Sequence, residues 1–240
     1  MLDAERSNRE QAACFVYRED IRFREIMPDG ATRAKDWVTY EVTMLEGEPY
    51  HRRVAMNGGP LPPDDESDEE KRYRQVEAYR QATPMEERRK RYFAAEENRF
   101  RIDAHIVLEW HNLKRAEDST LAGRAVWVVE AAPQRGAPKP KRRSQWSLSQ
   151  RLRFWVDKTT SLPLQIEGEQ LYDFDGSRKG TVTRVTYTEV EGVSLLARID
   201  SLGSRGSGKA IYSFETDQTY SNYRRFRAES VLWFEKPNEP

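Results

Sequence analysis

The sequence has little cysteine, little histidine and no long apolar segment. Its 240 residues include one cysteine, Cys14, and three histidines. A single cysteine excludes an intramolecular disulfide and any zinc cluster built on several cysteines. No apolar run approaches the roughly 20 residues that a membrane-spanning helix requires. We therefore expect an apolar core, rather than disulfides, to hold the fold together.

Net charge is also absent, because 40 Lys and Arg residues balance 40 Asp and Glu residues. Nucleic-acid binders usually carry a basic surplus, so this balance argues against nucleic acid as a partner. Hydrophobic residues make up 37% of the chain, yet 6 Trp, 11 Tyr and 9 Phe can still fill a core. The stretch after Met1, LDAERSNREQ, is too polar for a signal peptide. It fits either a cytoplasmic protein or an exported one whose signal is absent from this sequence.

The segment 148–174 indicates most clearly what kind of fold the chain adopts. Leu152, Phe154 and Val156 alternate with polar residues, which is the period of a half-buried strand. Residues 157–161 are short and polar and predict a turn. Pro163 is acceptable in the strand that follows because it stands at the start of that strand. The segment is therefore expected to be a long hairpin.

The same alternation recurs along most of the chain. Pro28, Asp29 and Gly30 form a turn signal between two alternating runs, which predicts another hairpin. Strands outside the central hairpin are expected at 13–27, 36–46, 50–56, 101–110, 124–132, 181–191, 193–200, 209–215 and 220–234. Strands of this number predict an α+β, mostly β protein with one large antiparallel sheet, strongly curved or closed.

The composition changes in the segment 64–98, which is rich in charge and helix formers. Ser67 with Glu70, and Thr83 with Glu86, fit capping boxes, so we expect helices over about 66–82 and 84–97. Their apolar stripes are narrow and include the four aromatic residues Tyr73, Tyr79, Tyr92 and Phe93. Such stripes fit either a solvated helical insertion or a lid over a cavity.

Two motifs predict sites that their surroundings do not support. Gly203 to Lys209 has the spacing of a phosphate-binding loop, but Ala210 replaces the required Ser or Thr and a strand pattern follows. A glycine-rich hairpin turn explains the same residues. His105, Glu109 and His111 would share one face of a strand, and Glu109 and His111 would be close enough to bind one metal ion. Two such residues on a polar face are more often a solvated face than a metal site. We expect neither a nucleotide nor a metal here.

The segment 133–144 predicts a basic loop. Lys139, Lys141, Arg142 and Arg143, with Trp146 nearby, fit a solvated loop, contact with anionic lipid headgroups, or contact with phosphates of a nucleic acid. The zero net charge disfavours the last of these. No G-x-S-x-G or H-E-x-x-H motif nominates a catalytic residue, so we expect no enzyme and no cofactor.

Several strands also carry large apolar residues on the face opposite their main apolar set. Trp127, Val129, Trp155, Leu171 and Leu196 are the members of this group. They indicate either a core on both faces of the sheet or an apolar cavity inside a curved sheet.

Four motifs, taken in order, show a family resemblance. They are EGEPY at 46–50, GRAVWVVEAAP at 123–133, RFWVD at 153–157 followed by LPL at 162–164, and YSNYRRF at 220–226. Together they resemble the LolA/LolB-like outer-membrane lipoprotein-sorting proteins, in particular an uncharacterised branch with a charged helical insertion. The resemblance covers nearly the whole chain.

The resemblance implies a single domain over residues 1–240, an incomplete barrel with helices on its concave side. It implies a periplasmic, non-enzymatic carrier of lipid or lipoprotein acyl chains, with the segment 64–98 as cover and Tyr73, Tyr79, Tyr92 and Phe93 as its lid residues. On this hypothesis we expect Phe15, Tyr40, Trp127, Trp155 and Phe214 to line the cavity. The alternative is an interaction module for another envelope protein or for a membrane surface, using a sheet edge or the basic loop.

Overall fold

The computed structural model of the chain describes residues 2–27, 29–96, 102–206 and 211–226. The helices are α1 (Leu2–Ala12), α2 (Pro63–Ala82), α3 (Met85–Glu96), α4 (Ala104–Trp110) and the 3₁₀ helix η1 (Arg143–Ser149). The strands are β1 (Phe15–Ile26), β2 (Thr32–Leu45), β3 (Glu48–Met56), β4 (Gly59–Pro60), β5 (His111–Arg115), β6 (Ser119–Leu121), β7 (Arg124–Pro133), β8 (Gln150–Asp157), β9 (Pro163–Gln170), β10 (Val182–Val190), β11 (Val193–Arg205) and β12 (Tyr212–Arg225).

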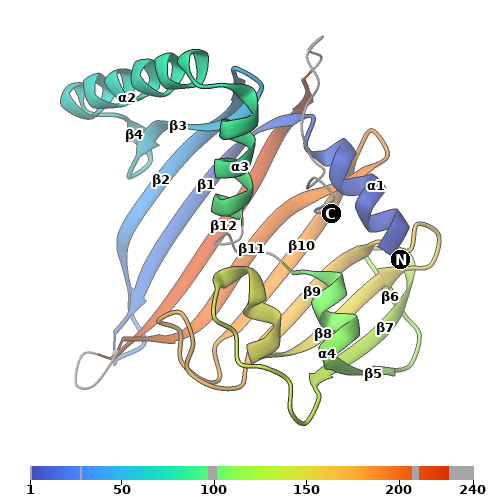
Figure 1. Ribbon diagram of the computed structural model, residues 1–240. Helices are drawn as coiled ribbons and strands as arrows, with labels where there is room; N and C mark the ends of the chain where they lie inside the picture. Colours follow the sequence, from blue (N-terminus) through green and yellow to red (C-terminus); the bar gives the residue numbers. More distant parts are fainter. Residues whose placement is uncertain (1, 28, 97–101, 207–210, 227–240) are drawn as a thin grey trace.

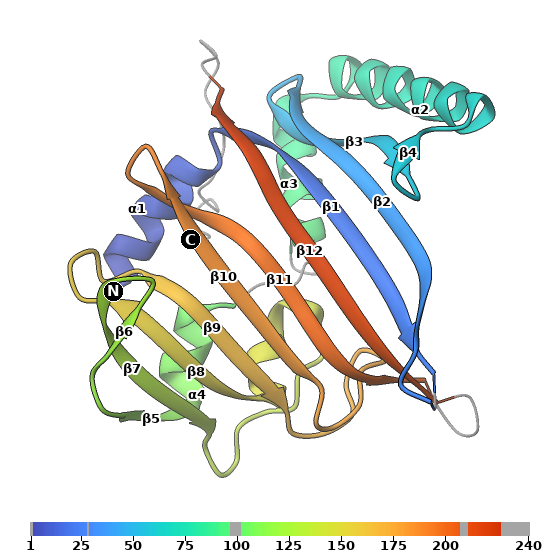
Figure 2. The same ribbon diagram turned by 180° about the vertical axis from the view of Figure 1, so that it is seen from behind.

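The strands form one antiparallel sheet in the order β4-β3-β2-β1-β12-β11-β10-β9-β8-β7-β5, and β6 pairs with β7. The sheet is strongly curved and open, because its two ends do not pair with each other in the described part of the chain. Helices α1, α3 and α4 lie on the concave side (Figure 1), whereas the view from behind shows bare strands (Figure 2). The mostly β class and the open curved sheet with helices on its concave side are confirmed.

Both predicted hairpins are confirmed. β1 and β2 pair around the predicted turn, and β8 and β9 pair around the turn that begins at Asp157. Pro163 is the first residue of β9. Across the second hairpin Phe154 faces Ile166 and Leu152 faces Gly168, so the alternation read from the sequence defines the register.

The strand predicted at 101–110 is wrong, because this segment contains α4. The Asp103 side chain caps the helix by accepting a hydrogen bond of 3.0 Å from the His105 N–H. Ala104, Val107 and Leu108 have the i, i+3, i+4 spacing of a helix face, and Val107 is buried. The strand begins only at His111. His105 and Glu109 therefore lie on the helix rather than on a strand with His111.

The predicted strands at 209–215 and 220–234 are also corrected, since the structure has the single strand β12. This strand pairs continuously with β1, and its first half also pairs with β11. Gly203 lies within β11, opposite Phe214, rather than in a turn. Residues 209–210 and 227–234 of these predictions lie outside the described residues.

The main core lies on the concave face. Its buried residues are Val107, Ala131, Trp146, Leu152, Ile166 and Val185. One cross-strand row runs through this core, from Val129 and Phe154 to Ile166, Val185 and Ile199. Side chains in such a row share one face of the sheet.

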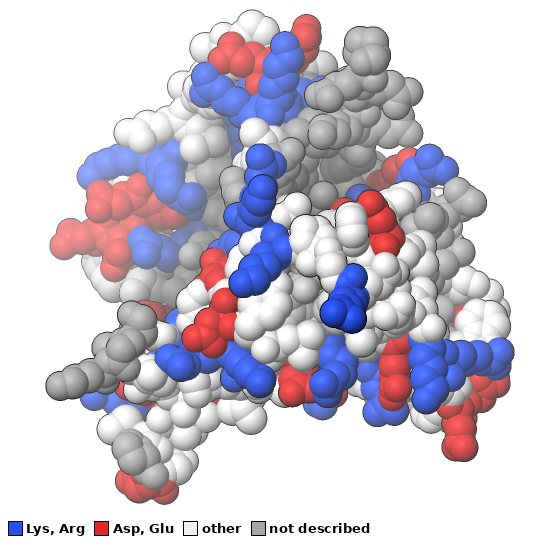
Figure 3. Space-filling model, turned by 60° about the horizontal axis from the view of Figure 1, so that its bottom comes forward, with Lys and Arg blue, Asp and Glu red and all other residues white. Residues whose placement is uncertain are grey.

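The convex face carries the charges that the composition requires. The residues next to the apolar row along each strand point to the opposite face. There, cross-strand ion pairs join Arg153 to Glu130, Arg184 to Glu167 and Arg198 to Asp217. Both signs are interspersed on the molecular surface as well (Figure 3). Each exposed pair contributes little to stability. Their effect is to keep one side of a very large sheet soluble while the other side is apolar.

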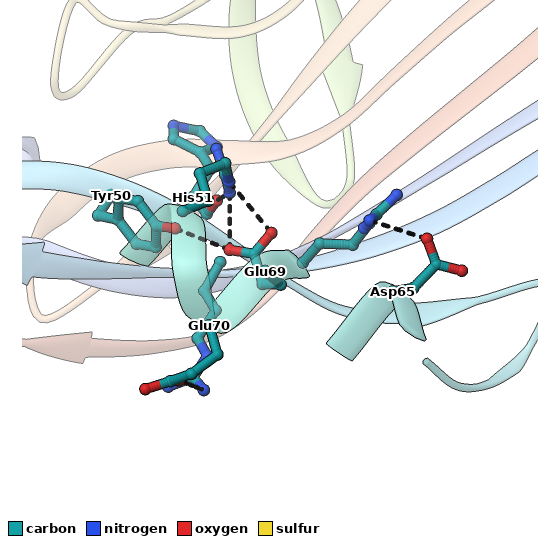
Figure 4. A network of polar contacts seen from close by, with 8 residues as sticks. Tyr50, His51, Asp65, Glu69 and Glu70 are labelled. Carbon is teal, nitrogen blue, oxygen red and sulfur yellow. Dashed lines mark hydrogen bonds and ion pairs between the residues drawn. The ribbon is translucent and has the colours of Figure 1, made fainter. Parts of the chain in front are cut away.

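The two predicted helices of the insertion are confirmed as α2 and α3, and α2 is joined to β3 by polar groups. The Glu69 carboxylate is only 5% exposed and accepts hydrogen bonds from the Tyr50 hydroxyl (2.8 Å) and from the Arg72 guanidinium (2.8 and 3.1 Å) (Figure 4). Burial, followed by the Glu69 hydrogen bond, raises the pKa of Tyr50 to about 12. Further along α2, Arg80 donates to the backbone oxygens of Leu45, Glu48 and Pro49.

Candidate functional site

A cavity of about 450 Å³ lies between the concave face of the sheet and the helices α1 and α4. Its lining is largely apolar. From the sheet and its turns come Tyr17, Leu113, Val129, Phe154, Val156, Leu162, Pro163, Ile166, Tyr187, Leu195, Leu196 and Tyr223. From the helical side come Ala12, Ile102, Ala104, Val107 and Leu108. The volume is in the range of small-molecule sites, which is about 300–1,000 Å³.

The floor of the cavity follows from strand alternation and one irregularity. Phe154 stands beside Val129 and Ile166 in the apolar row. The register of β8 against β9 shifts between Trp155 and Val156, which leaves Leu164 as an extra residue in β9 and lets Pro163 line the cavity with Ile166. On β8, Phe154 and Val156 are two residues apart and both line the cavity. The intervening Trp155 does not line it, and its ring centroid is 5.6 Å from the Arg153 guanidinium.

Helix α1 forms one side of the cavity and is held to β11 by one side chain. The Asn8 amide donates to the Ser194 backbone oxygen (2.8 Å) and accepts from the Ser194 N–H (2.7 Å). Ala12 adds an apolar contact to the small core of Phe15, Val193 and Leu195. The attachment of α1 thus rests on two hydrogen bonds and a small apolar area.

Charge is confined to one part of the lining. Glu5 and Arg9, both on α1, form an ion pair with each other. Burial raises the pKa values of the Tyr187 and Tyr223 phenols well above the ordinary range, so both are neutral at physiological pH. The Tyr223 hydroxyl donates to the Leu196 backbone oxygen at 2.6 Å. The deeper part of the cavity is therefore apolar and uncharged, which suits a hydrocarbon.

The five residues expected to line the cavity have other positions. Phe15 packs behind it, edge-on to Tyr223 at 6.2 Å, and Phe214 lines a second pocket. Tyr40 lies edge-on to His51 at 6.3 Å. Trp127 and Trp155 are half-buried on β7 and β8 and are not among the lining residues. Sequence alternation indicates that such residues share a face but does not indicate which face is concave.

Of the expected lid residues, Tyr73 and Tyr79 also lie away from this cavity. Tyr73 packs edge-on to Tyr50 at 5.4 Å, and Tyr79 is 40% exposed beneath Arg91. Tyr92 is half-buried on α3, and the side chain of Phe93 lies outside the described part of the structure. The helices that line the cavity are α1 and α4, and sequence reasoning missed both. The Asp103 cap was a signal for α4, whereas α1 has almost no apolar stripe.

The remaining sequence motifs do not form a second chemical centre. Within the described residues there is no group of three or more His, Cys, Asp or Glu side chains placed to bind a metal. His111 is buried, which lowers its pKa, and its Nε2 lies 3.1 Å from the Ser147 backbone oxygen. In the basic loop, Lys139 approaches the Tyr172 ring and Arg143 pairs with Asp175. None of the helices in the described part of the chain has the length and apolar character that crossing a membrane requires.

Comparison with models of known families gives no match, and no curated protein matches the chain. Among solved structures, the chain is similar to an outer membrane lipoprotein-sorting protein domain from Vibrio parahaemolyticus (11% identity, TM-score 0.38, 93% of this chain and 91% of that one). It is also similar to a LolA superfamily protein from Nitrosomonas europaea (10% identity, TM-score 0.38, 95% and 93%) and to a DUF1329 family protein from Desulfovibrio piger (11% identity, TM-score 0.39, 97% and 94%). Scores of this size carry no conclusion about function.

Proposed function

We propose that the protein binds the acyl chain of a lipid or lipoprotein in the cavity beneath α1 and α4, as a non-enzymatic periplasmic carrier. The observation that supports this most is the lining itself, which is apolar in its depth and has its one ion pair on α1. Each buried methylene of a ligand would contribute about 0.8 kcal/mol, without needing a polar partner. The periplasmic location is supported by the sequence resemblance.

Exposed apolar residues beside the cavity support an entrance for a hydrocarbon. Leu108 on α4 and Leu113 on β5 both line the cavity, and they are 39% and 45% exposed. Large apolar side chains that are both exposed and continuous with a cavity are typical of a binding mouth. We place the entrance between these two residues.

Replacing Leu113 by glutamate is expected to weaken acyl-chain binding at least about tenfold, because a carboxylate would then have to lose water beside the hydrocarbon. The measurement is titration of the purified protein with a fluorescent fatty acid. Native mass spectrometry, followed by lipid analysis of whatever is released, would identify a co-purifying ligand. Leu202→Glu is the matched control, since Leu202 is 56% exposed and does not line the cavity.

The result that would contradict the proposal is a clean unliganded mass combined with no uptake of the fluorescent fatty acid by the wild-type protein. Equal loss of binding in the Leu202 control would also count against it, because the effect would then not belong to this cavity. In either case the search would turn to a protein partner.

We further propose that α1 is the movable cover. Asn8→Ala removes both hydrogen bonds to Ser194 and should speed the release of a bound fatty acid by about fivefold to thirtyfold, as one to two lost hydrogen bonds would. Stopped-flow displacement of the fluorescent fatty acid measures this rate. Gln11→Ala is the control on the same helix, because the Gln11 side-chain amide donates to Ser7 of α1 itself, within the described residues. An unchanged rate in Asn8→Ala would show that α1 does not limit release.

A further inference from the structure

A second pocket, of about 310 Å³, lies on the concave face nearer η1. Its lining residues are Arg143, Trp146, Gln170, Phe174, Asp175, Ser177, Thr181, Thr183, Ile199, Ser201, Arg205, Phe214, Thr216 and Gln218. None of them lines the apolar cavity. The cross-strand row Ile166, Val185 and Ile199 and the Trp146 ring belong to the core between the two.

Hydroxyl groups occupy a sheet row where core residues would otherwise stand. Thr183, Ser201 and Thr216 are direct cross-strand neighbours, two residues beyond the apolar row and on the same face of the sheet. The Thr183 and Ser201 hydroxyls lie 2.8 Å apart. Three adjacent strands thus present hydroxyls to the same pocket. Such a row can donate to and accept from a ligand that has hydroxyl groups of its own.

Thr181 adds a hydroxyl without a partner. Its side chain is only 3% exposed, and among the described residues its Oγ1 has no hydrogen-bond partner. The Thr181 side chain can occupy this position only because residue 203 is glycine: a Cβ on Gly203 would lie 2.2 Å from the Thr181 Oγ1. Buried hydroxyls are normally paired, since leaving one unpaired costs stability. An unpaired hydroxyl that lines a pocket is therefore placed to bond a ligand.

Arg205 supplies the pocket's charge. Its Nε is buried without a hydrogen-bond partner, and the guanidinium lies 5.3 Å from the Phe214 ring centroid. Among the described residues, Arg205 forms no ion pair. Arg143 and Asp175 pair with each other and neutralise one another. With two arginines and one aspartate, the lining has a formal charge of +1. The uncompensated charge is that of Arg205.

We propose that this pocket binds a small hydroxylated ligand with a phosphate group, such as a glycerol phosphate or a sugar phosphate. The Arg205 guanidinium would pair with the phosphate, for which its planar array of donors is well suited. The hydroxyls of Thr181 and of the Thr183–Ser201–Thr216 row would bond the rest of the ligand. The same chemistry occurs in a free metabolite and in a phospholipid headgroup. The site does not depend on acyl-chain binding in the first cavity.

The test is isothermal titration of the full chain with glycerol 3-phosphate and with inorganic phosphate, together with sedimentation with phosphatidylglycerol vesicles. Arg205→Gln should weaken binding about tenfold or more, as expected for the loss of a charge-assisted contact. Thr181→Val keeps the side-chain shape, removes the hydroxyl and should weaken binding about threefold to tenfold. Arg151→Gln is the control, because Arg151 is exposed, pairs with Glu169 and does not line the pocket.

Binding of the soluble phosphates that is lost in Arg205→Gln identifies a free ligand, and binding only to vesicles that is lost in the same variant identifies a headgroup. No binding to either at millimolar ligand would overturn the proposal. So would binding that Arg205→Gln and Thr181→Val leave unchanged, or that Arg151→Gln reduces equally. Circular dichroism establishes that each variant is folded. If Arg205→Gln does not fold, the binding measured for Thr181→Val decides whether the proposal holds. Fluorescent fatty acid uptake is measured in parallel, so failure of one site is distinguishable from failure of the other.

Discussion

Replacing Asp157 by alanine is expected to lower the free energy of unfolding by about 3–5 kcal/mol. Asp157 is 2% exposed and begins the turn of the central hairpin. Its Oδ1 accepts from the N–H groups of Thr159 and Thr160, both at 2.8 Å, and its Oδ2 accepts from Arg124 Nε at 2.7 Å. Alanine would remove the shared acceptor of these three hydrogen bonds, and each hydrogen bond to a charged group contributes about 1.5–3 kcal/mol.

The same carboxylate should make stability depend on pH. Burial acts to raise the pKa of Asp157, but the hydrogen bonds from Thr160, Thr159 and Arg124 outweigh it, and the pKa lies below the ordinary value. A lowered pKa in the folded state means that the contribution is fully present above the unfolded value of about 3.9 and is lost as the pH falls through the folded pKa. The stability difference between wild type and Asp157→Ala should therefore be constant from pH 8 to 5, to within about 0.5 kcal/mol, and shrink in acid.

Urea unfolding of wild type, Asp157→Ala and Asp157→Asn at several pH values measures both effects. The asparagine variant keeps an acceptor for the two N–H groups but loses the charge that Arg124 contacts, so it should lose roughly half as much stability. If alanine costs less than about 1 kcal/mol, the turn is not held by this carboxylate. A difference that persists unchanged in acid would contradict the assigned pKa direction.

The second large effect is expected at Gly168 in β9. A Cβ at this position would lie 2.5 Å from the edge of the Trp146 ring and 3.2 Å from a Leu152 methyl group. Trp146 is 8% exposed and Leu152 is 1% exposed, so both side chains are packed in the core. Gly168→Ala should therefore destabilise the protein by about 1–3 kcal/mol through overpacking. It should also shift the tryptophan fluorescence.

Gly59→Ala is the control for that substitution. A Cβ at Gly59 would meet only the Met56 backbone oxygen, at 4.0 Å, which is ordinary contact. Its effect on stability should be within about 0.5 kcal/mol of zero. Equal midpoints of unfolding for the two variants would show that a Cβ at residue 168 does not destabilise the packing of the Trp146 ring.

The sequence was a good guide wherever one residue pattern had one structural solution. The alternation of Leu152, Phe154 and Val156, with the turn at Asp157, admits only a hairpin, and the structure has it. The segment 101–110 was different, because Ile102, Ile106 and Trp110 fit a strand while Ala104, Val107 and Leu108 fit a helix. A short apolar run cannot be decided by periodicity alone. The Asp103 cap decides it in the structure.

The cavity was harder to predict than the strands. Period-two alternation places Phe154 and Trp155 on opposite faces, but which face is concave depends on the curvature of the whole sheet. The register shift leaves Leu164 as an extra residue in β9, so that Pro163 lines the cavity with Ile166 although they are three residues apart, and nothing in the sequence marks such a shift. Helix α1 has mainly polar residues, so its contribution through Asn8 depends on a long-range contact with Ser194.

The manner in which α2 is joined to β3 has a thermodynamic consequence. The junction consists of the Glu69 carboxylate with Tyr50 and Arg72, and of Arg80 on three backbone oxygens. Separating it hydrates charges and hydroxyls rather than hydrocarbon, and the heat capacity of unfolding comes mainly from hydrocarbon. Release of α2 would therefore have a small heat-capacity signature, to which the contact between the Tyr50 and Tyr73 rings makes the apolar contribution. The helix can part from the sheet as a local event while the rest of the molecule stays native.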